Sequence, residues 1–155
     1  MKKIQPETIQ MTVKSRLKEL KRVEKLAMEI ASRIGLTRDQ TDNLSIAITE
    51  TVGNAIVHGN KKDPDKDVDI AVIIQPDTIR VQVQDRGEGF DPDSLSDPLD
   101  PENLLKESGR GIFILKSLMD NVSFSFSPKG TLVEFEMSLR RSSDSENGTV
   151  KKPER

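Results

Sequence analysis

The chain has 155 residues, of which 34% are hydrophobic and 32% charged, a size that fits one domain. Its formal charge of −2 does not favour a nucleic-acid-binding protein, and the absence of cysteine excludes disulfides and thiolate metal sites. A single histidine excludes a multi-histidine metal site. The sequence shows no apolar run of about 18 residues and no apolar signal core, so we expect a cytoplasmic protein without membrane contact.

The N-terminal part of the chain predicts one strand and two helices. Apolar and polar residues alternate over 9–13, which is the pattern of a strand. Apolar residues recur at helical spacing over 16–34, and Gly35 is placed to end that helix in a left-handed conformation. The Thr-Arg-Asp-Gln sequence at 37–40 is a capping-box pattern, which starts a second helix that we expect to continue to about residue 57.

The rest of the chain predicts two hairpins separated by a long loop and a third helix. The loop, 85–108, has few apolar residues, and an unpatterned segment of this length is often functional, for example as an active-site lid. The expected helix covers 112–119, and the expected strands are 68–74 and 79–83, then 122–126 and 133–139.

This order of elements predicts an α+β fold. Strands grouped in hairpins favour a mixed, mostly antiparallel sheet, and helices gathered on one face of it give a two-layer α/β sandwich. We expect the domain to span residues 1–139, and we expect the polar tail, 140–155, to be disordered.

The second helix carries an acid, an amide and the imidazole on one face. Glu50, Asn54 and His58 are spaced four residues apart, so they line the side opposite the apolar residues. An amide oxygen can ligate Mg²⁺, and a carboxylate one turn away can accept a proton from an attacking hydroxyl. Taken alone, the segment is explained equally well by an amphipathic helix with a solvated polar face.

Two further segments have residues suited to a flat ligand. Asp85 follows a strand and can accept a hydrogen bond from a base amino group. Gly87 and Gly89, before Phe90, let the backbone approach such a ligand closely, although an ordinary glycine turn is the alternative. Thr131 begins the last strand and can hydrogen-bond a ligand, although β-branched residues are common in strands.

A glycine-containing segment opens the third helix. Ser108, Gly109, Arg110 and Gly111 precede Ile112, and backbone N–H groups at a helix start favour anions. Arg110 adds a positive charge for phosphate, whereas a lid hinge with a plain helix cap is the alternative. The segment lacks the lysine of a P-loop and does not follow a strand, so neither a P-loop nor a dinucleotide-binding fingerprint applies.

In this order, the motifs resemble those of the GHKL ATPase superfamily, which includes gyrase, Hsp90, histidine kinases and MutL. Residues 50–59 resemble its N box, 85–90 and 109–112 its two glycine boxes, and 130–131 its final threonine motif. Within that superfamily the chain is most similar to bacterial anti-sigma factor serine kinases. This likeness rests on residues 47–59, on the Ser-Gly-Arg-Gly-Ile end of a short lid and on the length of the domain.

The resemblance implies a Bergerat ATP-binding fold with Mg²⁺ as cofactor. By this likeness Asn54 would coordinate Mg²⁺, Glu50 would be the general base, Asp85 would read the adenine amino group with support from Thr131, and 109–112 would wrap the phosphates. The second glycine box holds only two glycines, a departure that weakens the expected phosphate contacts. The expected nucleotide-binding set is Asn54, His58, Asp85, Gly87, Gly89, Phe90, Ser108, Gly109, Arg110, Gly111, Ile112 and Thr131.

The resemblance also implies partners. The chain would be an anti-sigma factor that sequesters a sigma factor and a kinase that phosphorylates a serine of a STAS-type anti-anti-sigma protein, and it would form a homodimer. Arg22 resembles an arginine that family members use at the partner surface.

The alternative is a nucleotide-dependent binding module of the same fold without phosphoryl transfer, against which Glu50 argues, since a pure binder needs no base. A histidine kinase would need a phospho-accepting histidine, and a gyrase-like or Hsp90-like machine would need further domains. Coincidence of four ordered motifs is improbable.

Overall fold

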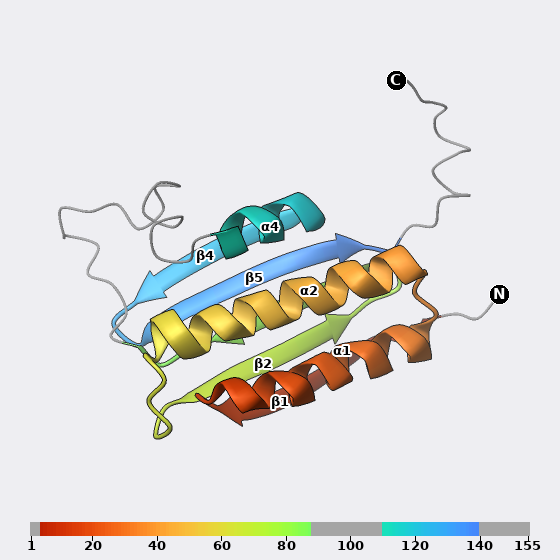
Figure 1. Ribbon diagram of the computed structural model, residues 1–155. Helices are drawn as coiled ribbons and strands as arrows, with labels where there is room; N and C mark the ends of the chain where they lie inside the picture. Colours follow the sequence, from red (N-terminus) through yellow and green to blue (C-terminus); the bar gives the residue numbers. More distant parts are fainter. Residues whose placement is uncertain (1–3, 88–109, 140–155) are drawn as a thin grey trace.

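The computed structural model describes residues 4–87 and 110–139, which form a five-stranded sheet with helices on one face (Figure 1). In chain order the elements are β1 Glu7–Lys14, the 3-10 turn η1 Leu17–Glu19, α1 Leu20–Ile34, α2 Arg38–Asn54, the π-helix η2 Ala55–Gly59, β2 Asp67–Ile74, β3 Thr78–Gln84, α4 Arg110–Leu118, β4 Asn121–Ser127 and β5 Gly130–Ser138. The strand order is β1-β2-β3-β5-β4, and every neighbouring pair is antiparallel. The predicted two-layer α+β sandwich is therefore confirmed.

The core lies between the sheet and the helices. In β2 and β3 every second side chain is buried, because alternate residues of a strand point to opposite faces of the sheet. Phe135 of β5 is the largest fully buried side chain. The helix α2 lies between α1 and α4 in this layer (Figure 1). None of the described helices combines the length and the apolar character that crossing a membrane requires.

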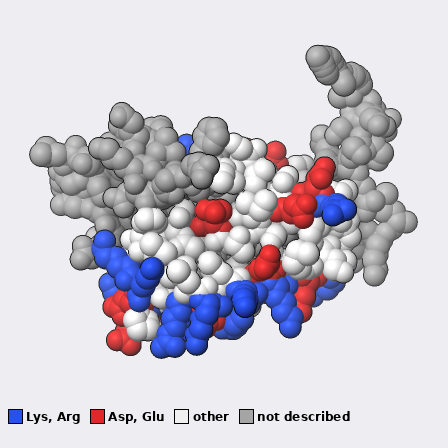
Figure 2. Space-filling model, viewed as in Figure 1, with Lys and Arg blue, Asp and Glu red and all other residues white. Residues whose placement is uncertain are grey.

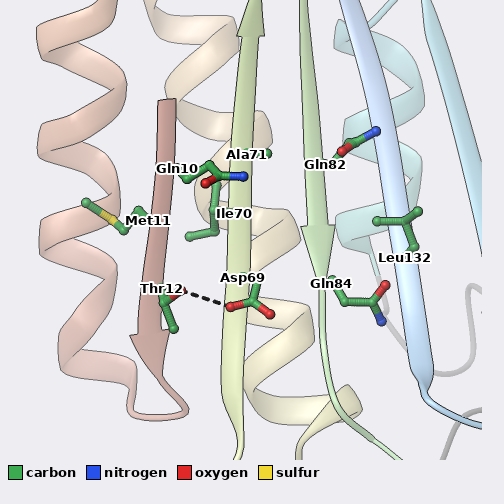
Figure 3. Close-up of a pocket in the computed structure, with 9 residues that line it drawn as sticks. All are labelled: Gln10, Met11, Thr12, Asp69, Ile70, Ala71, Gln82, Gln84 and Leu132. Atoms are coloured by element: carbon green, nitrogen blue, oxygen red, sulfur yellow. Dashed lines mark hydrogen bonds between the residues drawn. The ribbon is translucent and has the colours of Figure 1, made fainter. Parts of the chain in front are cut away.

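The other face of the sheet carries the polar half of the strand alternation, and no described element covers it. A shallow hollow lies on this face (Figure 3). Thr12 of β1 donates a hydrogen bond to Asp69 of β2 there, with 2.9 Å between Oγ1 and Oδ1. The hollow is lined by Gln10, Met11, Thr12, Asp69, Ile70, Ala71, Gln82, Gln84 and Leu132. This face is the solvated side of a sheet with one buried face.

Helix α1 begins later than its apolar spacing predicts. We expected it from Arg16, but residues 17–19 form a 3-10 turn and the α-helix starts at Leu20. Arg16 offers no capping side chain, so its carbonyl accepts the N–H of Glu19 instead. The end of the helix is as predicted, because Gly35 takes the left-handed conformation with φ 74°.

Helix α2 begins with the predicted capping box and ends earlier than predicted. The Thr37 side chain accepts the Gln40 N–H, and the Gln40 side chain accepts the Thr37 N–H. The α-helix stops at Asn54 rather than near Val57, and the next five residues form a π-helix. Its wider turn is closed by a 2.7 Å hydrogen bond from the Asn60 N–H to the Ala55 carbonyl.

Candidate functional site

Asp85 is a buried carboxylate just beyond the end of β3, on the same side of the sheet as the helices. Its Oδ1 accepts two backbone hydrogen bonds, from the N–H of Thr131 at 2.9 Å and from the N–H of Gly87 at 3.0 Å. Its own N–H donates to the Thr131 carbonyl at 3.0 Å. Among the described residues nothing donates to Oδ2. One carboxylate oxygen is therefore fixed by the protein, and the other can accept a hydrogen bond from a ligand.

Three glycines pack around Asp85. A Cβ at Gly59 would overlap the Asp85 carboxylate, and a Cβ at Gly87 would overlap the Gly59 carbonyl oxygen. Gly130 has φ 138°, a conformation that disfavours other residues, and a Cβ there would overlap the Asp85 carbonyl oxygen. Gly87 is therefore required by its packing against Gly59. The sequence motif predicted a glycine here for another reason, the close approach of a ligand to the backbone.

The π-helix is what brings Gly59 to this carboxylate. Residues 55–59 continue the axis of α2, but each turn holds more residues than an α-helical turn. Glu50 and Asn54 remain an α-helical pair one turn apart, whereas His58 lies in the π-helix and is exposed. Of the three residues predicted to share one α-helical face, only Glu50 and Asn54 therefore keep α-helical spacing. π-helical turns of this kind often occur at functional sites.

Glu50 and Asn54 lie on the flank of α2 that faces away from α1. Gly53 marks the α1 side, because a Cβ there would lie 3.8 Å from Cδ1 of Leu20, at the start of α1. At about 100° of rotation per residue, Asn54 and Glu50 are turned from Gly53 toward α4. Both side chains are half-buried, and within the described residues neither forms a hydrogen bond or ion pair. An amide and a carboxylate so placed are available to a ligand.

The described parts of the site meet at one end of the molecule. Figure 1 shows the end of α2, the start of α4, the end of β3 and the start of β5 at the same end of the sandwich. Asp85 and Thr131 belong to the strand side of this end, and Asn54 belongs to the helix side. The N-terminus of α4 adds backbone N–H groups that have no partner within the helix, together with the positive end of a helix dipole.

Several predicted residues cannot be placed. Gly89, Phe90, Ser108 and Gly109, most of the expected lid and the tail 140–155 lie outside the described residues. For Arg110, Gly111 and Ile112 the structure gives the backbone, which forms the first turn of α4, close to the predicted start of the third helix.

A metal at this site would depend on few protein ligands. Within the described residues no three His, Asp or Glu side chains gather to hold a metal ion. The unpaired amide of Asn54 fits Mg²⁺, which is commonly held by one or two protein oxygens together with water and substrate phosphate oxygens.

Arg22 lies in the first turn of α1, and its side chain is exposed. Its guanidinium contacts the Glu19 carboxylate at 2.8 Å. Six basic and three acidic residues occur between residues 16 and 33, although the whole chain has a net charge of −2. Figure 2 shows lysine and arginine side chains gathered along the lower edge of the view, where α1 lies in Figure 1. Leu17 and Met28 are each 46% exposed and add apolar area to this surface.

Asn60 is the residue that sequence analysis missed. The pattern placed it at the start of a turn rich in Lys, Asp and Pro, and nothing in the local sequence distinguishes it from a solvated turn residue. In the structure its side chain is buried and touches both β2 and the backbone beyond β3.

Comparison with known proteins agrees with this geometry. Residues 13–137 match the family described as the histidine kinase-like ATPase domain. A serine-protein kinase RsbW of Halalkalibacterium halodurans is 33% identical over 124 residues, which are 76% of this chain and 75% of that protein. The RsbW of Bacillus subtilis is 35% identical over 99 residues, and that of Oceanobacillus iheyensis is 29% identical over 102 residues. The chain spans 62% and 65% of the lengths of these last two relatives.

Solved structures agree with the fold. A crystal structure of the RsbU and RsbW domains of a Mycobacterium tuberculosis protein superposes with a TM-score of 0.65 at 19% identity, over 87% of this chain and 33% of that one. The histidine kinase domain of a blue-light activated kinase from Erythrobacter litoralis superposes with a TM-score of 0.54, over 83% of this chain and 62% of that one.

Proposed function

We propose that this chain, which belongs to the histidine kinase-like ATPase family and groups with the RsbW serine-protein kinases, is an ATP-dependent protein serine kinase and anti-sigma factor. It would sequester a sigma factor and phosphorylate a serine of a STAS-type anti-anti-sigma protein. The observation that carries the proposal is the buried Asp85 carboxylate, with one oxygen held by two backbone N–H groups and the other turned to no described donor.

Asp85 is suited to select adenine. The exocyclic amino group of adenine is a donor, and Asp85 Oδ2 is an acceptor in a buried place, where an unmatched polar group is costly. The glycine packing and the Thr131 N–H fix the direction of the carboxylate. Thr131 therefore supports recognition through its backbone as well as its predicted side-chain contact. His58, Gly87, Gly89 and Phe90 would complete the walls of the nucleotide site.

Glu50 is suited to take the proton of the acceptor serine. The serine oxygen attacks the γ-phosphorus of ATP, the bond from that phosphorus to the β,γ-bridging oxygen breaks, and ADP leaves. The hydroxyl proton passes to the Glu50 carboxylate. Mg²⁺, with Asn54 among its ligands, would neutralise charge on the phosphates. The α4 N-terminus and residues 108–112 would bind phosphate oxygens.

The exposed side of α1 is suited to bind the protein partners. Its basic excess would attract an acidic surface and speed encounter, and Leu17 and Met28 would add apolar contact. The exposed guanidinium of Arg22, which contacts only Glu19 among the described residues, would be available to pair with an acidic group of the partner. We further propose that the protein acts in the cytoplasm as a homodimer and contacts no nucleic acid directly.

The test is transfer of labelled phosphate. The purified protein is incubated with Mg²⁺ and γ-labelled ATP, alone and with the STAS protein of its own genome. Glu50→Gln is compared with Glu134→Gln, a matched change on the open face of the sheet. Label on a partner serine that is lost with Glu50→Gln and kept with Glu134→Gln supports the proposal.

Two other outcomes have definite meanings. If ATP binds tightly but no label transfers, the chain is a nucleotide-dependent binding module without phosphoryl transfer. If ATP does not bind at all, the assignment of the nucleotide site is wrong.

A further inference from the structure

Asn60 has a buried side chain with every polar function used. It is 1% exposed, and its Nδ2 donates to Ser15 Oγ at 2.8 Å and to the carbonyl oxygens of Asp67 at 3.0 Å and Lys66 at 3.4 Å. Its Oδ1 accepts the backbone N–H of Arg86 at 2.7 Å. One carboxamide therefore joins the end of β1, the start of β2 and the chain beyond β3.

The bond to Arg86 lies where regular strand pairing has stopped. The Asp85 N–H bonds to β5, so the next N–H, that of Arg86, points to the β2 side, and the β2–β3 register ends at the pair of Asp69 and Gln84. The Arg86 N–H therefore has no strand partner. Asn60 takes the place of that partner and fixes the peptide between Asp85 and Arg86. The Gln84 side chain, from the open face, donates to the carbonyl oxygen at the other end of the same peptide, that of Asp85, at 2.7 Å.

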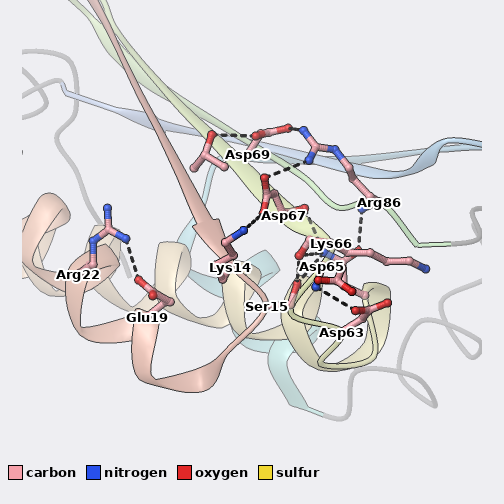
Figure 4. A network of polar contacts seen from close by, with 12 residues as sticks. Lys14, Ser15, Glu19, Arg22, Asp63, Asp65, Lys66, Asp67, Asp69 and Arg86 are labelled. Atoms are coloured by element: carbon pink, nitrogen blue, oxygen red, sulfur yellow. Dashed lines mark hydrogen bonds and ion pairs between the residues drawn. The ribbon is translucent and has the colours of Figure 1, made fainter.

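The Arg86 side chain anchors the same segment from the open face. Figure 4 shows its guanidinium beside Asp67 and Asp69, with which it forms ion pairs. These contacts are half-exposed, and pairs of that kind contribute little to stability. The buried hydrogen bond from Asn60 is the stronger constraint on the backbone.

We propose that Asn60 is a positioning residue of the nucleotide site, which sets the direction of the Asp85 carboxylate through the backbone of Arg86. The inference rests on the proposed role of Asp85 in reading adenine. The π-helix gives this arrangement its geometry, because the same turn brings Gly59 against the carboxylate and directs Asn60 toward the backbone that carries it. Asn60 itself touches no reacting group.

Ser15 provides a matched control for a purely structural role. It is also 1% exposed, and its hydroxyl accepts from Asn60 Nδ2 and donates to the Lys66 carbonyl at 2.6 Å. Ser15→Ala therefore damages the same buried network but leaves the bond between Asn60 Oδ1 and the Arg86 N–H in place. Asn60→Ala removes both the Nδ2 donor and the Oδ1 acceptor. Asn60→Asp keeps an acceptor for the Arg86 N–H but loses the hydrogen bonds that Nδ2 donates.

The experiment measures ATP and GTP dissociation constants by calorimetry with Mg²⁺, and stability by urea unfolding, for the unmodified protein and the three variants. We expect Asn60→Ala to weaken ATP binding about tenfold and to reduce the preference for ATP over GTP, because one buried hydrogen bond no longer holds the site. Ser15→Ala should lower stability but change ATP affinity less than about twofold, and Asn60→Asp should bind ATP more tightly than Asn60→Ala.

Equal loss of ATP affinity in Ser15→Ala and Asn60→Ala, or no loss in either, would overturn the proposal. If Asn60→Ala does not fold, the test is amide hydrogen exchange, measured without nucleotide on the unmodified protein and on Ser15→Ala. The Arg86 amide should then exchange as slowly as core strand amides in the unmodified protein and in Ser15→Ala, and fast exchange in both would sink the idea. If the unmodified protein does not bind ATP, the proposed function is refuted. The exchange measurement would still test whether Asn60 holds the Arg86 N–H.

Discussion

Gly87 packs against the backbone of Gly59, so that a Cβ on Gly87 would overlap the Gly59 carbonyl oxygen. Gly59 ends the π-helix and Gly87 follows β3, and their contact sets how closely the helix layer approaches Asp85. The spacing between the two layers at the candidate site therefore depends on the absence of a side chain at both positions.

Gly87→Ala should weaken ATP binding by at least about tenfold and destabilise the fold by about 1–3 kcal/mol, because backbone must move to admit the methyl group. Gly53→Ala is the matched control, since its new methyl would meet only Leu20 at ordinary contact distance. That change in a helix should add about 0.5–1 kcal/mol of stability and leave ATP affinity unaltered. Calorimetric titration and urea unfolding of both variants test the contrast, and equal ATP affinities would contradict it.

Asp85→Asn should reverse the polarity of the atom that faces the ligand. The side chain can still accept the Thr131 and Gly87 N–H groups through one oxygen, but an NH₂ group then occupies the place of Oδ2. We expect ATP affinity to fall roughly 10- to 150-fold, the worth of a hydrogen bond to a charged group, and the relative affinity for GTP to rise. Asp42→Asn, an exposed change of the same charge on α2, should alter neither. Unchanged ATP affinity in Asp85→Asn would remove Asp85 from the site.

The elements whose signals are local were predictable from the sequence. The Thr37–Gln40 capping box and Gly35 each act within a few residues, and the structure confirms both. The two hairpins also follow from alternation and turn residues. The predicted GHKL family is confirmed by the match over residues 13–137.

Features that depend on distant partners were not predictable. The carboxamide of Asn60 is explained by Ser15, 45 residues earlier, and by Arg86, 26 residues later. The early end of α2 and the π-helix after it bring Gly59 against Asp85, and no helical periodicity reveals this contact. The phosphate-binding and base roles of the predicted residues stay predictions.

Thr37→Ala should lower the free energy of unfolding by about 1 kcal/mol, because it leaves the Gln40 N–H without its cap. Thr41→Ala is the control one turn later, where the hydroxyl donates only to the Thr37 carbonyl, a bond that contributes little to a helix. Urea unfolding should separate the two, and both should keep full ATP affinity, since the cap lies at the opposite end of α2 from Asn54. Equal stabilities would show that the capping box does not stabilise the helix.

Arg22→Ala should weaken binding of the protein partner about tenfold while ATP affinity is retained. Arg33→Ala makes the same change at the other end of α1, where Arg33 pairs with Glu7 at 3.1 Å and is exposed to a similar degree. Surface plasmon resonance with the sigma factor and with the STAS protein, at two salt concentrations, measures the effect. If Arg33→Ala weakens binding as much as Arg22→Ala, general charge rather than a specific contact is responsible.

The order of strands has a consequence for how the protein matures. Helices α1 and α2 form from neighbouring residues on the microsecond scale, but the Thr131 N–H reaches Asp85 only after a loop of 46 residues closes. Pairing across such separations is the slow part of folding. A chain still being synthesised can hold its helices, its β2–β3 hairpin and Asp85, yet until β5 has emerged it lacks the Thr131 N–H, one of the two N–H groups that orient the carboxylate. If Asp85 reads adenine as proposed, the nucleotide site is completed only at the end of folding, later than the helix surface proposed to bind the partner.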